Sequence, residues 1–123
     1  MKRIIIDTNA LMAIAEFKLD IFATLSETCD FPFRIYILKG TIDELEKIIK
    51  VQRARFQMAA RIALALIKIH SLPIIKSSGN VDDALVGHSQ QGDLVLTQDI
   101  ALKRRLQKPY LTIRQKKKII IIK

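Results

Sequence analysis

Short runs of β-branched apolar residues alternate with helical stripes along the whole chain. The first run, Ile4 to Ile6, is apolar at every position, which is typical of a strand buried on both faces. The polar residues at 7–9 follow at once, and they are residue types that cap helices. The pattern therefore predicts a strand over 3–6 and a helix over 10–17, with a second short helix to follow.

The middle of the chain repeats this order. A strand is expected over 33–38, and Thr41 to Glu44 then has the form of a capping box, with a hydroxyl residue at the N-cap and a glutamate three residues later. This motif predicts a helix whose N-cap is Thr41. A further helix is expected over 54–70, and a short strand over 74–75.

The last third of the chain adds two more strands. The expected elements are a helix opened by the acids at 82 and 83, a strand over 94–97, a helix from 99 to 106 and a strand over 111–113. Regular alternation of strands and helices favours an α/β fold with right-handed crossovers. We therefore predict one domain, residues 1–123, with a central parallel five-stranded sheet flanked by helices.

The chain ends in a basic run at 114–118 and a short apolar stretch at 119–122. The apolar stretch is β-prone and has three possible fates. It can add an edge strand to its own sheet, pair with a second copy of the chain, or fray as a free end.

Size and charge narrow the function classes. The chain has 123 residues, half of them hydrophobic, and a formal net charge of +9. This length fits one domain with a core of its own. The charge favours contact with polyanions, of which nucleic acid is the first expectation and an anionic membrane surface the second. Lys-rich surfaces also serve solubility and ion pairing in proteins from hot environments.

Cys29 is the only cysteine. A single cysteine excludes an internal disulfide and a cysteine-based zinc site, and it fits a reducing, cytoplasmic location. The apolar run near the N-terminus ends at Asp7 and is too short to cross a bilayer. No membrane segment is expected.

Acidic residues recur where the predicted strands end. Asp7 directly follows the first strand, and Asp99 comes just after the fourth. Glu44 and the pair Asp82-Asp83 lie in the first turns of predicted helices. Each acid alone is explained as a helix cap or first-turn acid. Together they are expected at one sheet edge, where carboxylates repel each other unless a cation joins them. Oxygen ligands of this kind suit Mg²⁺ or Mn²⁺.

Four short motifs carry a resemblance to a known family. They are Ile-Ile-Asp-Thr-Asn at 5–9, Asp-Glu-Leu at 43–45, Asp-Asp-Ala-Leu-Val at 82–86 and Leu-Thr-Gln-Asp at 96–99. In this order and spacing they resemble the PIN domain, and the chain looks most similar to small archaeal PIN proteins of the VapC-like ribonuclease group. The run Ile-Arg-Gln-Lys-Lys-Lys at 113–118 is similar to the endings of that group.

The resemblance implies a metal-dependent endoribonuclease that hydrolyses single-stranded RNA with Mg²⁺ or Mn²⁺. The implied catalytic and metal-binding residues are Asp7, Glu44, Asp83 and Asp99, with Asp82 sharing or replacing the role of Asp83. Hydrogen bonds to these carboxylates are expected from Thr8, Asn9 and Thr97. Gln98 stands where Asn or Arg is more usual in the family.

The implied reaction is in-line attack by a metal-activated water, which leaves a 5′ phosphate and a 3′ hydroxyl. Binding of the RNA backbone requires cations outside the acidic group. The candidates are Arg53, Arg55, Lys103, Arg104, Arg105 and Lys108. Each of them has the simpler explanation of a solvated helix face.

The resemblance leaves the biological role open between a toxin, which needs an antitoxin protein as partner, and an RNA-processing nuclease. A homodimer is expected, because PIN proteins often form dimers. The alternative function is a non-catalytic RNA-binding PIN module in ribosome assembly. A receiver-like signalling domain is disfavoured, because Asp7 has no acidic neighbour and no aspartate follows the third strand. The short length disfavours a flap-type DNA nuclease.

Overall fold

The first strand of the chain lies in the middle of the sheet. The computed structural model describes residues 1–123, and its six strands stand in the order β3-β2-β1-β4-β5-β6. They are β1 (Lys2–Ile6), β2 (Phe33–Leu38), β3 (Ile74–Ile75), β4 (Leu94–Leu96), β5 (Tyr110–Arg114) and β6 (Lys118–Ile122). Strands β1 to β5 pair in parallel, and β6 pairs antiparallel with β5. Parallel strands end at one edge, so polar residues that follow β1 and β4 lie side by side.

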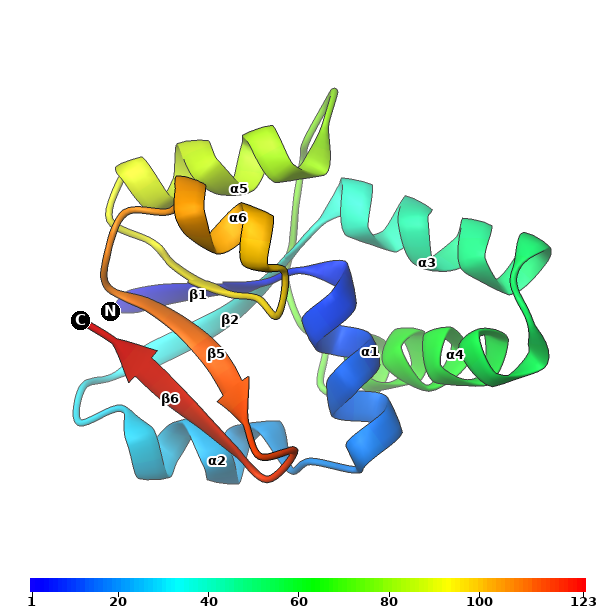
Figure 1. The fold of residues 1–123 in the computed structure, drawn as a ribbon, viewed down its shortest axis with the longest axis horizontal. Coiled ribbons are helices and arrows are strands. Elements are labelled where there is room, and N and C mark those ends of the chain that lie inside the picture. The colour runs from blue at the N-terminus through cyan, green and yellow to red at the C-terminus, as the bar shows by residue number, and fades with distance from the viewer.

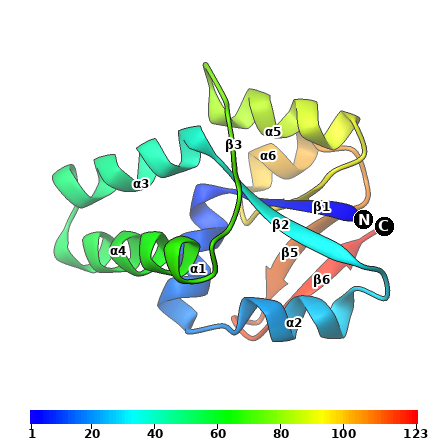
Figure 2. The same cartoon turned by 180° about the vertical axis from the view of Figure 1, so that it is seen from behind.

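Helices cover both faces of this sheet (Figures 1 and 2). They are α1 (Thr8–Phe17), α2 (Ile21–Thr28), α3 (Lys39–Val51), α4 (Ala54–Ile69), α5 (Val81–Gln90) and α6 (Ile100–Arg105). The larger core cluster joins the sheet to α1, α2, α3 and α4, and the smaller one joins it to α5 and α6. Helices α1, α3, α5 and α6 follow the parallel strands β1, β2, β3 and β4, so their N-termini lie toward the carboxyl edge of the sheet.

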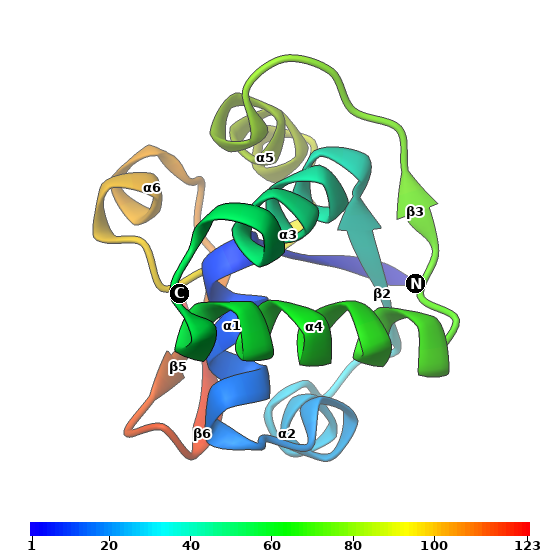
Figure 3. The same ribbon diagram turned by 90° about the vertical axis from the view of Figure 1, so that its right-hand side faces the viewer.

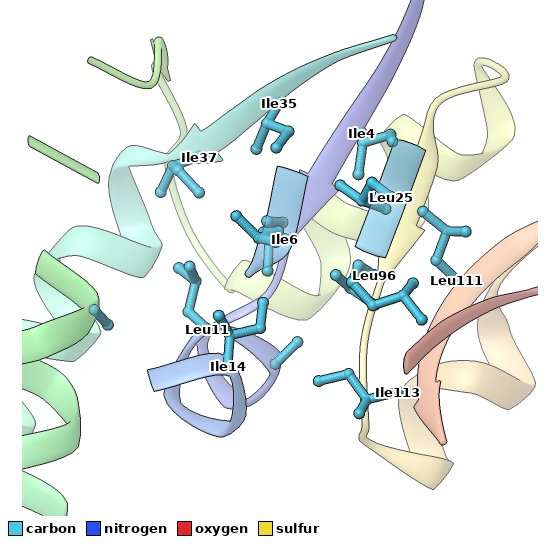
Figure 4. Close-up of a cluster of buried hydrophobic side chains, with 14 of the residues drawn as sticks. Ile4, Ile6, Leu11, Ile14, Leu25, Ile35, Ile37, Leu96, Leu111 and Ile113 are labelled. Carbon is cyan, nitrogen blue, oxygen red and sulfur yellow. The ribbon is translucent and has the colours of Figure 1, made fainter. Parts of the chain in front are cut away.

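Alternation of side chains along β1 divides the core between the two faces. Ile4 and Ile6 belong to the larger cluster, whereas Ile5 belongs to the smaller one. Figure 4 shows Ile6 among Leu11 and Ile14 of α1, on the larger face. All three isoleucines of β1 are completely buried. This explains why the strand reads as a continuous apolar run, as expected for a central parallel strand.

The predicted α/β class and the parallel sheet flanked by helices are confirmed. The sheet has six strands instead of five, because the apolar tail joins it as β6. Ile119 pairs with Ile113 and Ile121 with Leu111. The hydroxyl of Thr28 at the end of α2 donates a hydrogen bond to the carbonyl of Ile119. Of the three fates considered for the tail, the structure has the edge strand of its own sheet.

The predicted capping box at Thr41 is wrong. The N-cap of α3 is Leu38, three positions before Thr41, and the apolar side chain of Leu38 accepts no hydrogen bond. Thr41 lies inside the helix, where its hydroxyl is buried without a partner. The side chain of Ser77, from the loop after β3, accepts the N–H of Gly40 at 2.9 Å. A residue far along the chain therefore satisfies a first-turn N–H that a local cap would otherwise satisfy.

A close approach holds α3 against α5. A Cβ atom at Gly40 would lie 2.7 Å from Cγ2 of Val81, the first residue of α5. Only glycine permits this distance. The contact brings the first turns of α3 and α5 together; Asp82 lies in the first turn of α5, and Glu44 lies in the second turn of α3. No helix of the protein combines the length and apolarity needed to cross a membrane.

Candidate active site

An open pocket of about 380 Å³ lies at the carboxyl edge of β1 and β4. Four acidic side chains line it, one each from the starts of four helices or the loops before them. The lining residues are Asp7, Thr8, Asn9, Glu44, Lys47, Ile48, Val81, Asp82 and Asp99. The structure brings Asp7, Glu44, Asp82 and Asp99, which come from distant segments of the chain, together at one edge of the sheet.

Asp7 is the buried acid of the pocket, with 4% of its surface exposed. It follows β1 directly and is the N-cap of α1, so its Oδ1 accepts the N–H of Ala10 at 2.7 Å. Its Oδ2 accepts the hydroxyl of Thr97. Burial raises the pKa of Asp7 to about 6. These two hydrogen bonds oppose the rise in pKa, and the nearby charges of Asp82 and Asp99 add to it.

Thr97 connects two of the acids. Its side chain is fully buried, and it donates to Asp7 while accepting the N–H of Asp99 at 3.0 Å. Asp99 is also the N-cap of α6, where its Oδ1 accepts the N–H of Leu102 at 3.2 Å. Capping thus fixes the Asp99 backbone at the pocket and leaves its other carboxylate oxygen for a ligand. The capping role and the pocket role of this residue are compatible.

Glu44 enters the pocket from the second turn of α3. Its Oε1 accepts the hydroxyl of Thr8, which is buried at the start of α1. Lys47 stands one helical turn after Glu44 and lines the same pocket. Sequence reasoning did not select Lys47, although its spacing from Glu44 placed both side chains on one helix face.

The structure brings Asp82, not Asp83, into the pocket. Asp83 was the expected third acid, with Asp82 sharing or replacing it. Oδ1 of Asp83 accepts a hydrogen bond from Nη2 of Arg105 at 2.7 Å, and the two side chains are 68% and 47% exposed. Neighbouring residues on a helix point about 100° apart, so only one of the two acids can face the pocket.

The donor set fits a hard divalent cation. All four acids offer carboxylate oxygens, which suit Mg²⁺ or Mn²⁺, and no thiol or imidazole lines the pocket to favour zinc. The like charges that raise the pKa of Asp7 are charges that a cation would compensate. In this arrangement no three acidic, histidine or cysteine side chains converge tightly on one point. Asp82 is half-buried, so its side chain has room to turn toward a cation.

None of the six residues expected to bind RNA lines the acidic pocket. Arg55 pairs with Glu16 and Arg105 with Asp83. Lys103 and Arg104 lie in the last turn of α6, and Arg53 precedes α4. Lys108 lines a different pocket beside Lys2, at the opposite edge of the sheet.

This α/β sheet, with acids gathered at its carboxyl edge, defines the chain as a domain of the PIN type. The chain belongs to the PIN like domain family, whose model matches residues 4–116. The resemblance inferred from the sequence motifs is therefore confirmed.

Relatives with assigned names are similar over most of their length. Ribonuclease VapC4 of Methanocaldococcus jannaschii is 28% identical over 123 residues, which covers 95% of this chain and 94% of that protein. Ribonuclease VapC9 of Archaeoglobus fulgidus is 29% identical over 103 residues, which covers 82% of this chain and 73% of that protein. Among solved structures, the PIN domain endonuclease Utp24 has a TM-score of 0.75 and 27% identity, and the match covers 97% of this chain and 90% of that one.

Proposed function

We propose that this protein is a metal-dependent endoribonuclease that hydrolyses phosphodiester bonds of single-stranded RNA. The observation that carries the proposal is the buried carboxylate of Asp7, fixed by Thr97 and facing Asp82 and Asp99 across one pocket. Similarity to two proteins named ribonucleases and to a PIN domain endonuclease supports the same chemistry.

The residues that would hold Mg²⁺ or Mn²⁺ are Asp7, Asp82 and Asp99, with Glu44 at the rim. When bound, such an ion supplies positive charge to the phosphate and makes a water molecule more acidic. Thr97 holds Asp7 in one orientation, and Thr8 does the same for Glu44. A carboxylate that is already oriented loses little freedom when it binds a ligand.

Two side chains of the pocket, Glu44 and Lys47, are expected to act on the water and on the substrate. Oε1 of Glu44 accepts the Thr8 hydroxyl, so we expect Oε2 to take the proton from the attacking water. Lys47 is the one cation that lines the pocket, and we expect it to contact a phosphate oxygen of the substrate. Attack by water, not by the RNA 2′ hydroxyl, leaves a 5′ phosphate and a 3′ hydroxyl.

The test is cleavage of a labelled single-stranded RNA by the full chain with Mg²⁺, with Mn²⁺ and with EDTA, beside Asp7→Asn. We expect cleavage that requires metal, disappears in the variant and leaves 5′ phosphates. Products with a 2′,3′-cyclic phosphate would contradict the mechanism. Metal-independent cleavage that Asp7→Asn retains would contradict the site itself.

The alternative is a non-catalytic RNA-binding PIN module in ribosome assembly. The observation on its side is that no three acids converge tightly on one point. It predicts salt-sensitive RNA binding without cleavage in either metal.

An antitoxin protein and a second copy of the chain follow from the family resemblance as partners, and both stay predictions, as do the toxin and RNA-processing roles.

A further inference from the structure

The hairpin between β5 and β6 turns through an unfavourable backbone conformation. The N–H of Lys117 donates to the carbonyl of Arg114 at 3.2 Å, and the central residues Gln115 and Lys116 have φ angles of 58° and 57°. A type I′ turn requires such angles at both central positions, which strongly favours Asn-Gly or Gly-Gly. Side chains at positive φ each cost about 1 kcal/mol. Gln115 and Lys116 therefore occupy positions at which the backbone conformation favours glycine or asparagine.

The side chains of this turn form an unpaired group of positive charges. We call Arg114, Lys116, Lys117 and Lys118 the basic turn; all four are exposed. None of them takes part in an ion pair, whereas Arg55 and Arg105 do. The basic turn is therefore the densest concentration of uncompensated charge along the sequence. Such a group in a +9 protein favours a polyanionic ligand.

The basic turn follows β5, which is parallel to β4 and β1, so it lies at the same edge of the sheet as the acids, and two contacts connect it to elements of the pocket. Nζ of Lys116 lies 5.4 Å from the ring centroid of Phe17, the last residue of α1. Helix α1 begins beside Asp7, so its 10 residues span about 15 Å between the pocket and the turn. Figure 3 shows α1 running from the end of β1 down to the β5–β6 hairpin.

The second contact links the turn to the loop that carries Asp99. Oε1 of Gln98 accepts the Thr112 hydroxyl at 2.8 Å and the Ile113 N–H at 2.7 Å. Gln98 precedes Asp99 and Ile113 precedes Arg114, so this amide ties an acid of the pocket to the first cation of the turn. The departure at Gln98 from the family's usual residue therefore has a structural role here.

We propose that the basic turn binds the phosphate backbone of the single-stranded RNA substrate a few nucleotides from the bond that is cut. The inference rests on the proposed function. The pocket itself repels RNA through its four acids, so binding requires cations nearby that the acids do not neutralise. The basic turn supplies them, and the Gln98 contact holds it in fixed register with Asp99.

Binding is tested with a labelled single-stranded RNA and the full chain carrying Asp7→Asn, so that cleavage does not interfere. The triple variant Lys116→Gln/Lys117→Gln/Lys118→Gln should bind RNA about tenfold or more weakly and lower the salt slope by about two. The matched control is Lys50→Gln/Lys68→Gln/Lys123→Gln, which removes equal charge at exposed positions outside the turn and the pocket. Equal losses in both variants would overturn the proposal.

Lys116→Gly separates binding from folding. Glycine suits the φ of 57°, so this variant should unfold at a higher temperature than the parent and still bind RNA more weakly. Unchanged RNA affinity in the more stable variant would overturn the proposal.

Two outcomes separate this proposal from the proposed function. If the unmodified protein does not cut RNA but the turn variants bind RNA more weakly, RNA binding by the basic turn is supported and the nuclease function is refuted. If the triple variant cuts RNA with the KM and salt dependence of the parent, the nuclease function is supported and RNA binding by the basic turn is refuted. Loss of binding to vesicles of anionic phospholipid with RNA affinity retained would also overturn the proposal, because the turn would then serve a membrane surface.

Discussion

The hydroxyl of Thr97 donates a hydrogen bond to the carboxylate of Asp7 from 90 residues away in the sequence. The same oxygen accepts the N–H of Asp99. One buried hydroxyl thus fixes one acid directly and a second through its backbone. The arrangement depends on β1 and β4 being neighbours, which aligns Ile6 with Leu96 and places Asp7 beside Thr97.

Replacing Thr97 by valine should weaken the site without emptying the space that the side chain fills. Asp7 would lose a hydrogen bond that lowers its pKa, so the pKa should rise further above its ordinary value. We expect the affinity for Mn²⁺ and the cleavage rate to fall about 10- to 100-fold, which is typical for the loss of a group that orients a metal ligand. Calorimetric Mn²⁺ binding and RNA cleavage measure the two effects. Thr97→Ser retains the hydroxyl and should remain close to the parent; a valine variant with parental metal affinity would contradict this role.

The burial of Asp7 should appear in the pH dependence of stability without metal. The pKa of Asp7 is about 6 in the folded chain against an ordinary value of 3.8, so the folded state holds the proton more tightly. Its contribution to the free energy of unfolding is therefore favourable at low pH and is lost as pH rises from about 4 to 6. Asp7→Asn does not titrate, so in EDTA it should be more stable than the parent by up to about 3 kcal/mol at pH 7.

Urea unfolding at pH 3.5 and pH 7 measures this difference. The advantage of Asp7→Asn should be largest at pH 7 and shrink toward pH 3.5. Added Mn²⁺ should then stabilise the parent and not the variant, because only the parent keeps the buried ligand. An advantage that is equal at both pH values would rule out titration of Asp7 as its source.

Asp82 and Asp83 should differ sharply despite being neighbours. Asp82 lines the pocket, whereas Asp83 pairs with Arg105 on the surface. Asp82→Asn should reduce cleavage by about 100-fold or more, as expected when a charge that stabilises the transition state is lost. Asp83→Asn should cut RNA at close to the parental rate and change stability by less than about 1 kcal/mol, because exposed ion pairs contribute little. The reverse order of activities would show that the other acid serves the site.

Gly40→Ala should disturb the pocket from outside it. The added methyl group would lie 2.7 Å from Cγ2 of Val81 and push the start of α5, with Asp82, away from α3. Overpacking of this kind costs about 1–3 kcal/mol. Val81→Ala removes the clashing atom, so the double variant should recover part of the stability and cleavage lost in Gly40→Ala.

The matched control lies in the same helix pair. Gly87 of α5 has open space around its missing Cβ, so Gly87→Ala should stabilise the chain by about 0.5–1 kcal/mol. Thermal unfolding and cleavage rates compare the three variants. Failure of Val81→Ala to restore anything would show that Gly40 matters for another reason.

The five parallel strands were predictable because each depends on the local pattern of apolar residues. Ile4 to Ile6 is apolar at every position, and burial on both faces of the sheet is the simplest explanation. Asp7 and Asp99 were likewise readable as N-caps, and each accepts the expected backbone N–H. These features are determined by residues that are close together in the sequence.

The sequence predictions are wrong where contacts with distant segments of the chain determine the structure. The start of α3 depends on Ser77, which lies 37 residues from Gly40, so the motif at Thr41 was misleading. The choice between Asp82 and Asp83 depends on the rotation of α5, which is set by burial of Leu85 and Ser89 against the sheet and the chain near Gln107. Lys47 was missed because a single lysine on a helix face has no signature of its own.

The central position of β1 has a consequence for how the protein is made. The first strand to leave the ribosome needs both β2 and β4 beside it, and β4 is synthesised only after residue 93. Until then Asp7 has no Thr97, and neither Asp99 nor the basic turn exists. The nascent chain therefore emerges next to ribosomal RNA without a complete acidic pocket, and this pocket assembles only when synthesis is nearly finished.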